Sequence, residues 1–411
     1  MKAGPSTIDG SRLCHSIEEM ARVGALPHGG SRRLALSEED GRARDLFASW
    51  CRDAGCETHV DQFGNQFGIR RGLAPGEPLV MFGSHLDTQP NGGRFDGIYG
   101  VLAGLEVMRT LHAAGVQTER SLAVVNWTNE EGVRFSPGLT GSKGFAGLLA
   151  LQDVATLKSS DGTSFHDELA RLGYLGTPAP FKVASYFEAH IEQGPVLEAA
   201  KLAVGVVTGV QGVRWFEVQV TGADRHAGTT PMSMRADSFM ASCRMALGLR
   251  TAALAVSADI RLTFGRVSVQ PGSVNTVPGH THFTIDLRHP DRAVLDRVEG
   301  LILELSANEA KAEGCQVAVQ KVFDLPPVAF DEGAVDRVAV AAHNNDLPTM
   351  RIVSGAMHDA CALATVAPTA MIFTACRLGI SHSEDEFAEP NDLAAGCQVL
   401  LDAVLAAARL T

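Results

Sequence analysis

The hydrophobic pattern of the strand-like segments changes twice along this 411-residue chain. In the first half, the runs Pro78–Ser84 and Ser121–Trp127 are apolar almost throughout, which is typical of strands buried on both faces of a parallel sheet. After Val210, the segment Arg214–Val220 instead alternates between polar and apolar residues, as in a sheet with one solvated face. Beyond Pro326-Pro327 the continuous apolar runs return. We therefore expect one α/β domain that is interrupted by an inserted second domain.

The outer segments predict the strands and helices of the α/β domain. Leu13, Ile17, Met20 and Val23 are spaced as one face of a helix. A second helix is expected after Ser37, with Asp40 three residues on as its capping-box partner. Further helices are expected at Gly97–Ala114 and Asp392–Leu410, and further strands at Thr58–Val60, Phe67–Arg70, Val183–Ala189, Arg351–Val353 and Thr369–Thr374.

The middle segment predicts a small α+β domain. Its expected order is strand, helix, two strands, helix and strand, which is the split βαβ order of a ferredoxin-like domain. The elements are Arg214–Val220, Ser233–Leu254, Asp259–Val267, Thr281–Leu287, Ala293–Ala312 and Gln316–Phe323. The predicted fold is thus an α/β domain with a mixed, mainly parallel sheet over residues 1–212 and 327–411, interrupted by a smaller ferredoxin-like domain over residues 213–326.

Composition and charge narrow the class of protein. The formal net charge of −12 leaves no basic excess of the kind that nucleic-acid binding requires. No uninterrupted apolar run reaches the roughly 18 residues of a membrane span, and the first nine residues do not resemble a secretory signal. The eight cysteines are scattered without a C-x-x-C pair, which favours free thiols in a reducing compartment. We expect a cytoplasmic protein that binds neither nucleic acid nor membrane.

Candidate metal ligands follow the first buried strand. His85 and Asp87 lie two residues apart at its end, so that both side chains leave on one face. Asp96 stands in a glycine-flanked turn before the next helix. Histidine and carboxylate are ligands that zinc accepts, and the carboxyl ends of parallel strands are where open α/β sheets place their sites. Taken singly, His85 would more often be a core histidine and Asp96 a helix cap.

Three further strand-like runs end in similar side chains. The pair Glu130-Glu131 follows one run, His190 ends another, and His382 follows the last. Taken alone, adjacent carboxylates at a strand end are typical of a solvated turn. Because four strand ends carry such groups and parallel strands end at the same edge of a sheet, a metal site becomes the favoured interpretation.

On these motifs, the chain resembles the zinc-dependent N-carbamoyl-amino-acid amidohydrolases of the hydantoinase/carbamoylase group. That group includes allantoate amidohydrolases and β-ureidopropionases, and it belongs to the metallopeptidase superfamily of aminoacylases and dipeptidases. The resemblance runs nearly end to end, from Arg33–Ser37 and Asp61–Asn65 to Ile380–Ser383.

The resemblance implies two divalent metal ions bridged by Asp96. One ion is expected to be held also by His85 and His190, and the other by Glu131 and His382. Zinc is the expected metal, with manganese and cobalt as alternatives, because ligand type and affinity order do not settle occupancy.

The resemblance also implies roles in the reaction. Glu130 is expected to deprotonate the attacking water and then to protonate the leaving nitrogen. Asp87 is expected to orient the ring of His85, since metal-bound histidines usually donate their other N–H to such a partner.

The remaining implied residues contact the substrate. His226 is expected to stabilise the oxyanion from the partner subunit of a homodimer, which makes the inserted domain a lid and dimerisation domain. Arg288 resembles the family's arginine, whose planar guanidinium binds the substrate carboxylate, and Asn275 is expected beside it. Gln193 resembles the glutamine that contacts the carbamoyl group. Without the resemblance, His226 and Arg288 would more often be surface residues.

Two positions depart from the family pattern. Met357 stands where glycine is common, which adds bulk where the family's substrate lies, and Ala375-Cys376 replaces a usual Pro-Ser pair. Both departures bear on the identity of the substrate more than on the chemistry.

The implied function is hydrolysis of an N-carbamoyl-L-amino acid to amino acid, ammonia and carbon dioxide. Allantoate or N-carbamoyl-β-alanine is the alternative substrate, and an aminoacylase or dipeptidase is a more distant one. Two other classes stay open at this point: a non-catalytic homologue, and an amidase with Cys361 as nucleophile close to His358.

Overall fold

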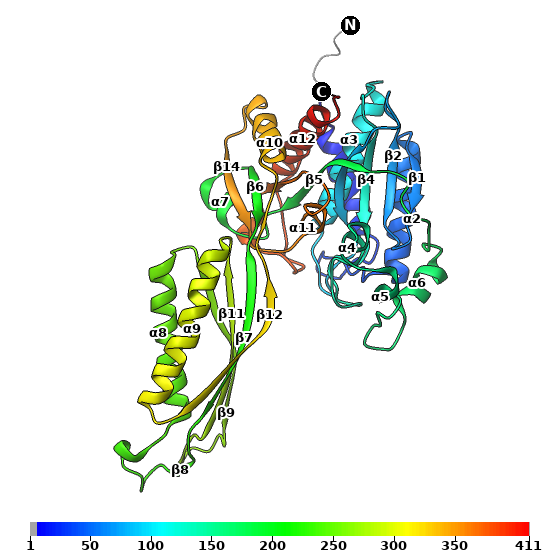
Figure 1. Cartoon of the computed structure of the whole chain (residues 1–411). Helices are drawn as coiled ribbons and strands as arrows, with labels where there is room; N and C mark the ends of the chain where they lie inside the picture. The colour runs from blue at the N-terminus through cyan, green and yellow to red at the C-terminus, as the bar shows by residue number, and fades with distance from the viewer. Residues whose placement is uncertain (1–5, 411) are drawn as a thin grey trace. The chain divides into compact units, whose positions relative to one another are not determined.

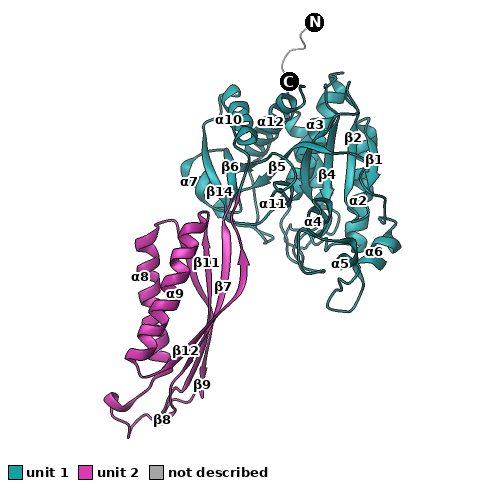
Figure 2. Ribbon diagram, viewed as in Figure 1, with its two compact units in different colours: residues 1–209, 329–411 teal, residues 210–328 magenta. Residues whose placement is uncertain are grey.

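The computed structural model describes residues 6–410, which divide into two compact units. The first unit comprises the chain up to Gly209 together with Ala329 and the residues after it, and the second unit is Val210–Val328 (Figure 2). A segment inserted into the middle of the chain thus forms a unit of its own.

Two helices open the first unit. α1 (Gly10–Ala21) buries the predicted stripe of Leu13, Ile17 and Met20. α2 (Glu38–Asp53) begins after Ser37, whose side chain accepts a hydrogen bond from the Asp40 N–H. Only this half of the predicted capping box forms, because the Asp40 carboxylate instead accepts from the Leu36 N–H and pairs with Arg44.

A nine-stranded sheet forms the centre of the first unit. Its path is β1-β2-β4-β3-β5-β15-β6-β13, with β14 paired to β6. The strands β4, β3, β5 and β15 run parallel at the middle, whereas β1, β2 and β6 pair antiparallel, so the predicted mainly parallel sheet is confirmed. The strands are β1 (Glu57–Val60), β2 (Gln66–Arg70), β3 (Leu79–His85), β4 (Leu122–Trp127), β5 (Val183–Ile191), β6 (Val204–Val210), β13 (Val328–Ala329), β14 (Thr349–Ser354) and β15 (Thr369–Thr374).

Helices pack on this sheet. α3 (Ile98–Ala113) and α12 (Pro390–Ala407) contact the central strands, and α1 packs against both of them (Figure 1). β3 and β4 are buried along their whole length, as their continuous apolar runs predict. The other helices of this unit are α4 (Thr140–Phe145), α5 (Leu151–Val154), α6 (Phe165–Leu172), α7 (Val196–Ala200), α10 (Glu332–Asn344) and α11 (Asp359–Leu363), with a 3-10 turn at Arg377–Gly379.

The second unit is an antiparallel four-stranded sheet with two helices side by side on one face (Figure 1). The strand order β12-β7-β11-β9 is that of a ferredoxin-like domain, as predicted. Phe216, Val218 and Val220 of β7 face the helices and are buried, whereas Trp215 on the other face is exposed. The elements are β7 (Gly212–Thr221), β8 (Arg225–His226), a 3-10 turn at Met232–Met234, α8 (Ser238–Val256), β9 (Arg261–Gln270), β10 (Thr276–Val277), β11 (His280–His289), α9 (Arg292–Ala312) and β12 (Gln316–Leu325).

α8 departs from the expectation that no segment is apolar enough to cross a membrane. Among residues 6–410, it is the one helix whose length and composition would suffice. One of its faces, which includes Met245 and Leu249, packs against the sheet of the second unit. The opposite face exposes Phe239, Met240 and Leu247. Packing explains the apolar character of the first face only.

Candidate dinuclear metal centre

The sequence-predicted metal ligands meet at the carboxyl ends of the parallel strands. β3 ends at His85, β5 carries His190 one residue before its end, and the remaining three ligands stand in loops that follow β3, β4 and β15. The structure gathers all five into one cluster, namely His85, Asp96, Glu131, His190 and His382. This placement follows from the parallel topology, because parallel strands end at the same edge of a sheet.

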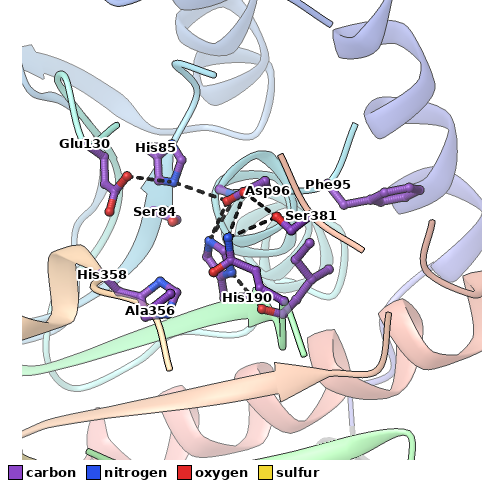
Figure 3. Close-up of polar contacts among 12 residues, drawn as sticks. Ser84, His85, Phe95, Asp96, Glu130, His190, Ala356, His358 and Ser381 are labelled. Atoms are coloured by element: carbon purple, nitrogen blue, oxygen red, sulfur yellow. Dashed lines mark hydrogen bonds and ion pairs between the residues drawn. The ribbon is translucent and has the colours of Figure 1, made fainter. Parts of the chain in front are cut away.

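Asp96 is the residue that the two ligand groups share, and Figure 3 shows it joined by dashed lines to its neighbours His85 and His190. Its Oδ1 lies 3.2 Å from Nε2 of His190 and 3.8 Å from Nε2 of His85. Its Oδ2 lies 3.2 Å from Nε2 of His382, which is in turn 3.7 Å from Oε2 of Glu131. The ligand atoms therefore form two groups that share only Asp96: one with the two strand histidines, and one with Glu131 and His382.

The charged groups of this cluster shift one another's protonation equilibria. Burial opposes protonation of His190, but the hydrogen bond and charge of Asp96 outweigh it and raise the His190 pKa to about 9. The hydrogen bond to Asp96 likewise raises the pKa of His382 to about 9. Burial, followed by the charge of Asp96, raises the pKa of Glu131 to about 8. The Asp96 carboxylate contributes to all three shifts.

The donor set fits divalent metal ions. Each group offers imidazole nitrogen and carboxylate oxygen within 4.8 Å of one another, and these are the ligand types of Zn²⁺ and, among other ions, Mn²⁺ and Co²⁺. Burying like-charged carboxylates together is costly unless positive charge compensates them. Two cations that share the Asp96 carboxylate would supply that charge.

Main-chain carbonyls orient the two strand histidines. Nδ1 of His85 lies 2.9 Å from the carbonyl oxygen of Asp87, and Nδ1 of His190 lies 2.9 Å from that of Ile191. Each ring therefore turns its Nε2 toward Asp96. Asp87 thus contacts the His85 ring through its main-chain carbonyl, while its carboxylate accepts hydrogen bonds of 3.2 Å from the main-chain N–H groups of Glu130 and Glu131.

Glu130 faces the same space. Its Oε2 lies 3.6 Å from Nε2 of His85 (Figure 3). Burial, together with the charges of Asp359 and Glu131, raises the pKa of Glu130 well above its ordinary value. Glu130 thus stands beside the ligand groups, within the cavity that they line, where a general base is required.

The ligands and Glu130 line a cavity of about 240 Å³ within the first unit. Met357 and Gln193 also line it, as predicted for substrate-contacting residues. The Gln193 Nε2 donates to Oδ2 of Asp96 at 2.9 Å, while its Oε1 is buried without a hydrogen-bond partner among residues 6–410. Gln193 and His382 both have left-handed backbone conformations, with φ of 56° and 55°.

The other predicted substrate residues belong to the second unit. The Nδ1 of His226 accepts from the N–H groups of Gly228 and Thr229, which places the ring proton on Nε2. Thr276, next to Asn275, pairs with His226 across β8 and β10. On β11, Arg288 is held bidentately by Asp286, at 2.8 and 2.9 Å.

Several residues that support the centre were not predicted from the sequence. The Gln89 Nε2 donates to Oε2 of Glu131 at 2.6 Å. Glu188 is fully buried in β5 and accepts hydrogen bonds from the Ser84 hydroxyl and the Ala360 N–H. Glu386 accepts from the main chain of the Asp96 loop. The position of Glu188, two residues before His190 on the same strand, was the one hint available.

The Cys361 alternative does not suit this geometry. Burial raises the pKa of the Cys361 thiol to about 12, whereas a nucleophilic cysteine needs a lowered pKa. His358 turns its Nε2 to the Ser354 hydroxyl at 2.9 Å. All eight cysteines are free thiols.

Comparison with known proteins settles the family. The model of peptidase family M20/M25/M40 matches residues 81–406. The chain belongs to this family. It is 42% identical to an N-carbamoyl-L-amino-acid amidohydrolase of Rhizobium meliloti, over 98% of this chain and 97% of that protein. It is 48% identical to a hydantoinase/carbamoylase family amidase from Burkholderia ambifaria, whose crystal structure matches with a TM-score of 0.95 over 99% of this chain and all of that one.

More distant members mark the breadth of this family. A ureidoglycolate hydrolase of Oryza sativa is 32% identical over the whole of this chain and 86% of its own length. A dinuclear metal-binding M20 peptidase from Bacillus subtilis shares the fold, with a TM-score of 0.63 and 13% identity over 97% of this chain and 98% of that one. The chain is thus a member of the M20 family and an enzyme that hydrolyses linear amides. The resemblance stated from the sequence is confirmed, apart from the identity of the metal.

Proposed function

We propose that the enzyme hydrolyses the carbamoyl C–N bond of an N-carbamoyl-L-amino acid. One water is consumed, and the products are the amino acid, ammonia and carbon dioxide. The observation that carries the proposal is the pair of ligand groups sharing Asp96 with Glu130 beside them. The similarity to an amidohydrolase of that substrate class over nearly the full length supports it.

Two divalent ions would be held by the two ligand groups. His85, His190 and Asp96 would hold one ion, and Asp96, Glu131 and His382 the other. When bound, such ions polarise a carbonyl and make a bound water more acidic. Zinc is the expected metal, with manganese or cobalt as alternatives.

Glu130 would move the protons of the reaction. Its carboxylate would take a proton from the attacking water and deliver it to the leaving nitrogen. Asp87 supports this role by accepting the N–H of Glu130, which fixes the main chain from which the catalytic carboxylate extends.

The residues that the family resemblance implies as substrate contacts are part of the proposal. Gln193 and Met357 line the cavity and would contact the carbamoyl group and limit the space beside it. The planar Arg288 would bind the substrate carboxylate, with Asn275 nearby. His226 would donate its Nε2 proton to the developing oxyanion, a role that suits the tautomer fixed by Gly228 and Thr229.

We further propose a homodimer in which residues 213–326 serve as lid and dimerisation domain and His226 reaches the partner's site. The exposed apolar face of α8 supports an interface, because Phe239, Met240, Leu247 and Leu254 lie there. The free cysteines accord with a cytoplasmic enzyme.

A second candidate is another ureido substrate with a carboxylate, such as allantoate or N-carbamoyl-β-alanine. The 32% identity to a ureidoglycolate hydrolase favours keeping it. The chemistry at Glu130 and the metal ligands would be the same. Only the contacts of the substrate carboxylate and side chain would differ.

A substrate panel tests the proposal. Metal-loaded enzyme is assayed for ammonia and free amine on N-carbamoyl-L-amino acids, N-carbamoyl-β-alanine, allantoate, N-acetyl amino acids and a dipeptide. Equal amounts of ammonia and amine from an N-carbamoyl-L-amino acid are expected. Ammonia from allantoate alone would replace the first candidate by the second. Amine without ammonia, from acetyl or dipeptide substrates, would overturn both candidates.

A further inference from the structure

A buried carboxylate joins the two loops that carry Asp96 and His382. Glu386 is 1% exposed and follows His382 in the loop between β15 and α12. Its Oε1 accepts hydrogen bonds from the main-chain N–H groups of Phe95, at 2.8 Å, and of Asp96, at 3.1 Å. One side chain from the His382 loop therefore holds the main chain of the bridging ligand.

The same carboxylate reaches the His382 side through a hydroxyl. Oε2 of Glu386 lies 3.2 Å from Oγ of Ser381, the residue before His382. The Ser381 Oγ also lies 2.8 Å from Oδ2 of Asp96, toward which it points in Figure 3. That Oδ2 is the oxygen 3.2 Å from the His382 ring. Glu386 and Ser381 thus fix both the main chain and the side chain of Asp96 relative to His382.

Two further contacts show that this junction is closely packed. The rings of Phe95 and Phe387, the neighbours of Asp96 and Glu386, meet edge to face with centroids 6.2 Å apart. At Gly93 a Cβ atom would lie 2.1 Å from Cδ of Glu386. A residue with a side chain at position 93 would therefore displace the Glu386 carboxylate.

The two ligand groups depend on this junction to different degrees. His85 and His190 lie in strands, and main-chain carbonyls fix their rings. His382 lies in a loop, and its side chain is 49% exposed. Loosening the junction should therefore disturb the group of Asp96, Glu131 and His382 more than the other group.

We propose that Glu386 is a positioning residue that holds the Asp96 and His382 loops together. It thereby sets the affinity for the ion that Asp96, Glu131 and His382 would bind. The proposal rests on the two-ion centre of the proposed function. It adds a residue that belongs to neither ligand group nor to the cavity lining and acts through the Asp96 main chain and the Ser381 hydroxyl.

Cobalt titration of the full-length, metal-stripped enzyme tests this role. The uptake of Co²⁺ is followed by calorimetry and by its visible absorption in the wild type, Glu386→Ala and Glu386→Gln. The wild type is expected to bind two ions. Glu386→Ala should bind the ion of the Asp96, Glu131 and His382 group about 10- to 100-fold more weakly, the usual effect of losing a partner that orients a ligand. The ion of the group with His85 and His190 should be weakened clearly less, because it shares only Asp96 with the loosened junction.

Glu386→Gln should bind both ions nearly as the wild type does. Its amide oxygen still accepts from the Phe95 and Asp96 N–H groups, and its NH₂ group still reaches the Ser381 oxygen. The matched control is Asp385→Ala, which removes an exposed carboxylate from the same loop. This control should leave both affinities unchanged.

Wild-type affinities in Glu386→Ala, or equal weakening in Asp385→Ala, would overturn the proposal. If Glu386→Ala does not fold, Ser381→Ala replaces it and should weaken the binding of the same ion. Failure of the proposed function would be seen separately, as a wild type that binds two Co²⁺ ions yet hydrolyses no ureido substrate. A wild type that binds fewer than two ions would overturn both.

Discussion

The carboxylate of Asp87 accepts a 3.2 Å hydrogen bond from the main-chain N–H of Glu130, while the carbonyl of the same residue contacts the His85 ring. Asp87 therefore serves the catalytic loop with its side chain and the metal ligand with its main chain. Asp87→Asn should lower kcat about 10- to 100-fold, because one of the two N–H groups loses its acceptor. Metal content should stay at two ions per chain, since the carbonyl that contacts His85 remains. Loss of an ion in this variant, measured by elemental analysis, would contradict the assignment.

Glu130→Gln tests whether Glu130 is the general base of the reaction. The amide cannot accept the proton of the attacking water, so kcat should fall about 10²- to 10⁴-fold. Both ions should remain, because Glu130 belongs to neither ligand group. Steady-state kinetics and metal analysis of the same preparation check this prediction. A kcat within threefold of the wild type, which is roughly 0.7 kcal/mol in activation free energy, would rule out Glu130 as the base.

Removing the metal should abolish activity, and reagents for thiols should not. Dialysis against a chelator followed by Zn²⁺, Mn²⁺ or Co²⁺ should restore hydrolysis and also raise Tm, because an ion that binds only the folded state stabilises it. Iodoacetamide should leave the rate unchanged, since burial keeps the pKa of Cys361 at about 12. The reverse pattern, with thiol inhibition and chelator resistance, would point to a cysteine nucleophile.

The homodimer can be tested by complementation. His226→Ala and Glu130→Gln protomers are each expected to be inactive as homodimers. In a mixed dimer, one site would combine an intact Glu130 with an intact His226 from the other protomer. Random mixing should then recover about a quarter of the wild-type activity. Mixed dimers that are verified by mass and yet inactive would show that His226 does not act across an interface.

Asp61 should make stability depend on pH. Burial raises the Asp61 pKa from 3.8 to about 6, against its hydrogen bonds with Asn65 and Phe63. The folded state holds this proton more tightly than the unfolded state does, so the contribution of Asp61 to stability falls as pH rises from about 4 to 6. The loss is of the order of 3 kcal/mol. Urea unfolding at pH 4, 5 and 6 measures the free energy of unfolding. This free energy should fall less steeply with pH in Asp61→Asn than in the wild type, and equal slopes would refute the raised pKa of Asp61.

The ligand set could be predicted from the sequence because the parallel topology of the sheet determines where the side chains at the strand ends lie. Once Pro78–Ser84 and its counterparts are interpreted as parallel strands, the groups at their ends must meet at one edge. The partner of the Asp87 carboxylate could not be predicted in this way. It depends on the path of the loop after β4, which places two N–H groups within its reach.

Neither the role of Glu386 nor the strand β6 could be predicted from the local sequence. Glu386 is an acidic residue in a polar loop, and its burial arises only because the glycine at position 93 leaves room for it. The segment Val204–Val210 contains two glycines and is short, so its pattern does not distinguish a strand from a loop. Short helices such as α5 and α11 lack the length that would make a periodicity visible.

The left-handed backbones of Gln193 and His382 set a limit on engineering this enzyme. A side chain in that conformation costs about 1–3 kcal/mol, which glycine would avoid. Replacing Gln193 by glycine would therefore relax the backbone while removing a cavity-lining amide, whereas glycine at position 382 would also lose the stabilisation that a bound ion gives. Screens that select only for thermal tolerance will tend to enrich the replacement of Gln193, and the most heat-resistant descendants of this chain would then include inactive ones.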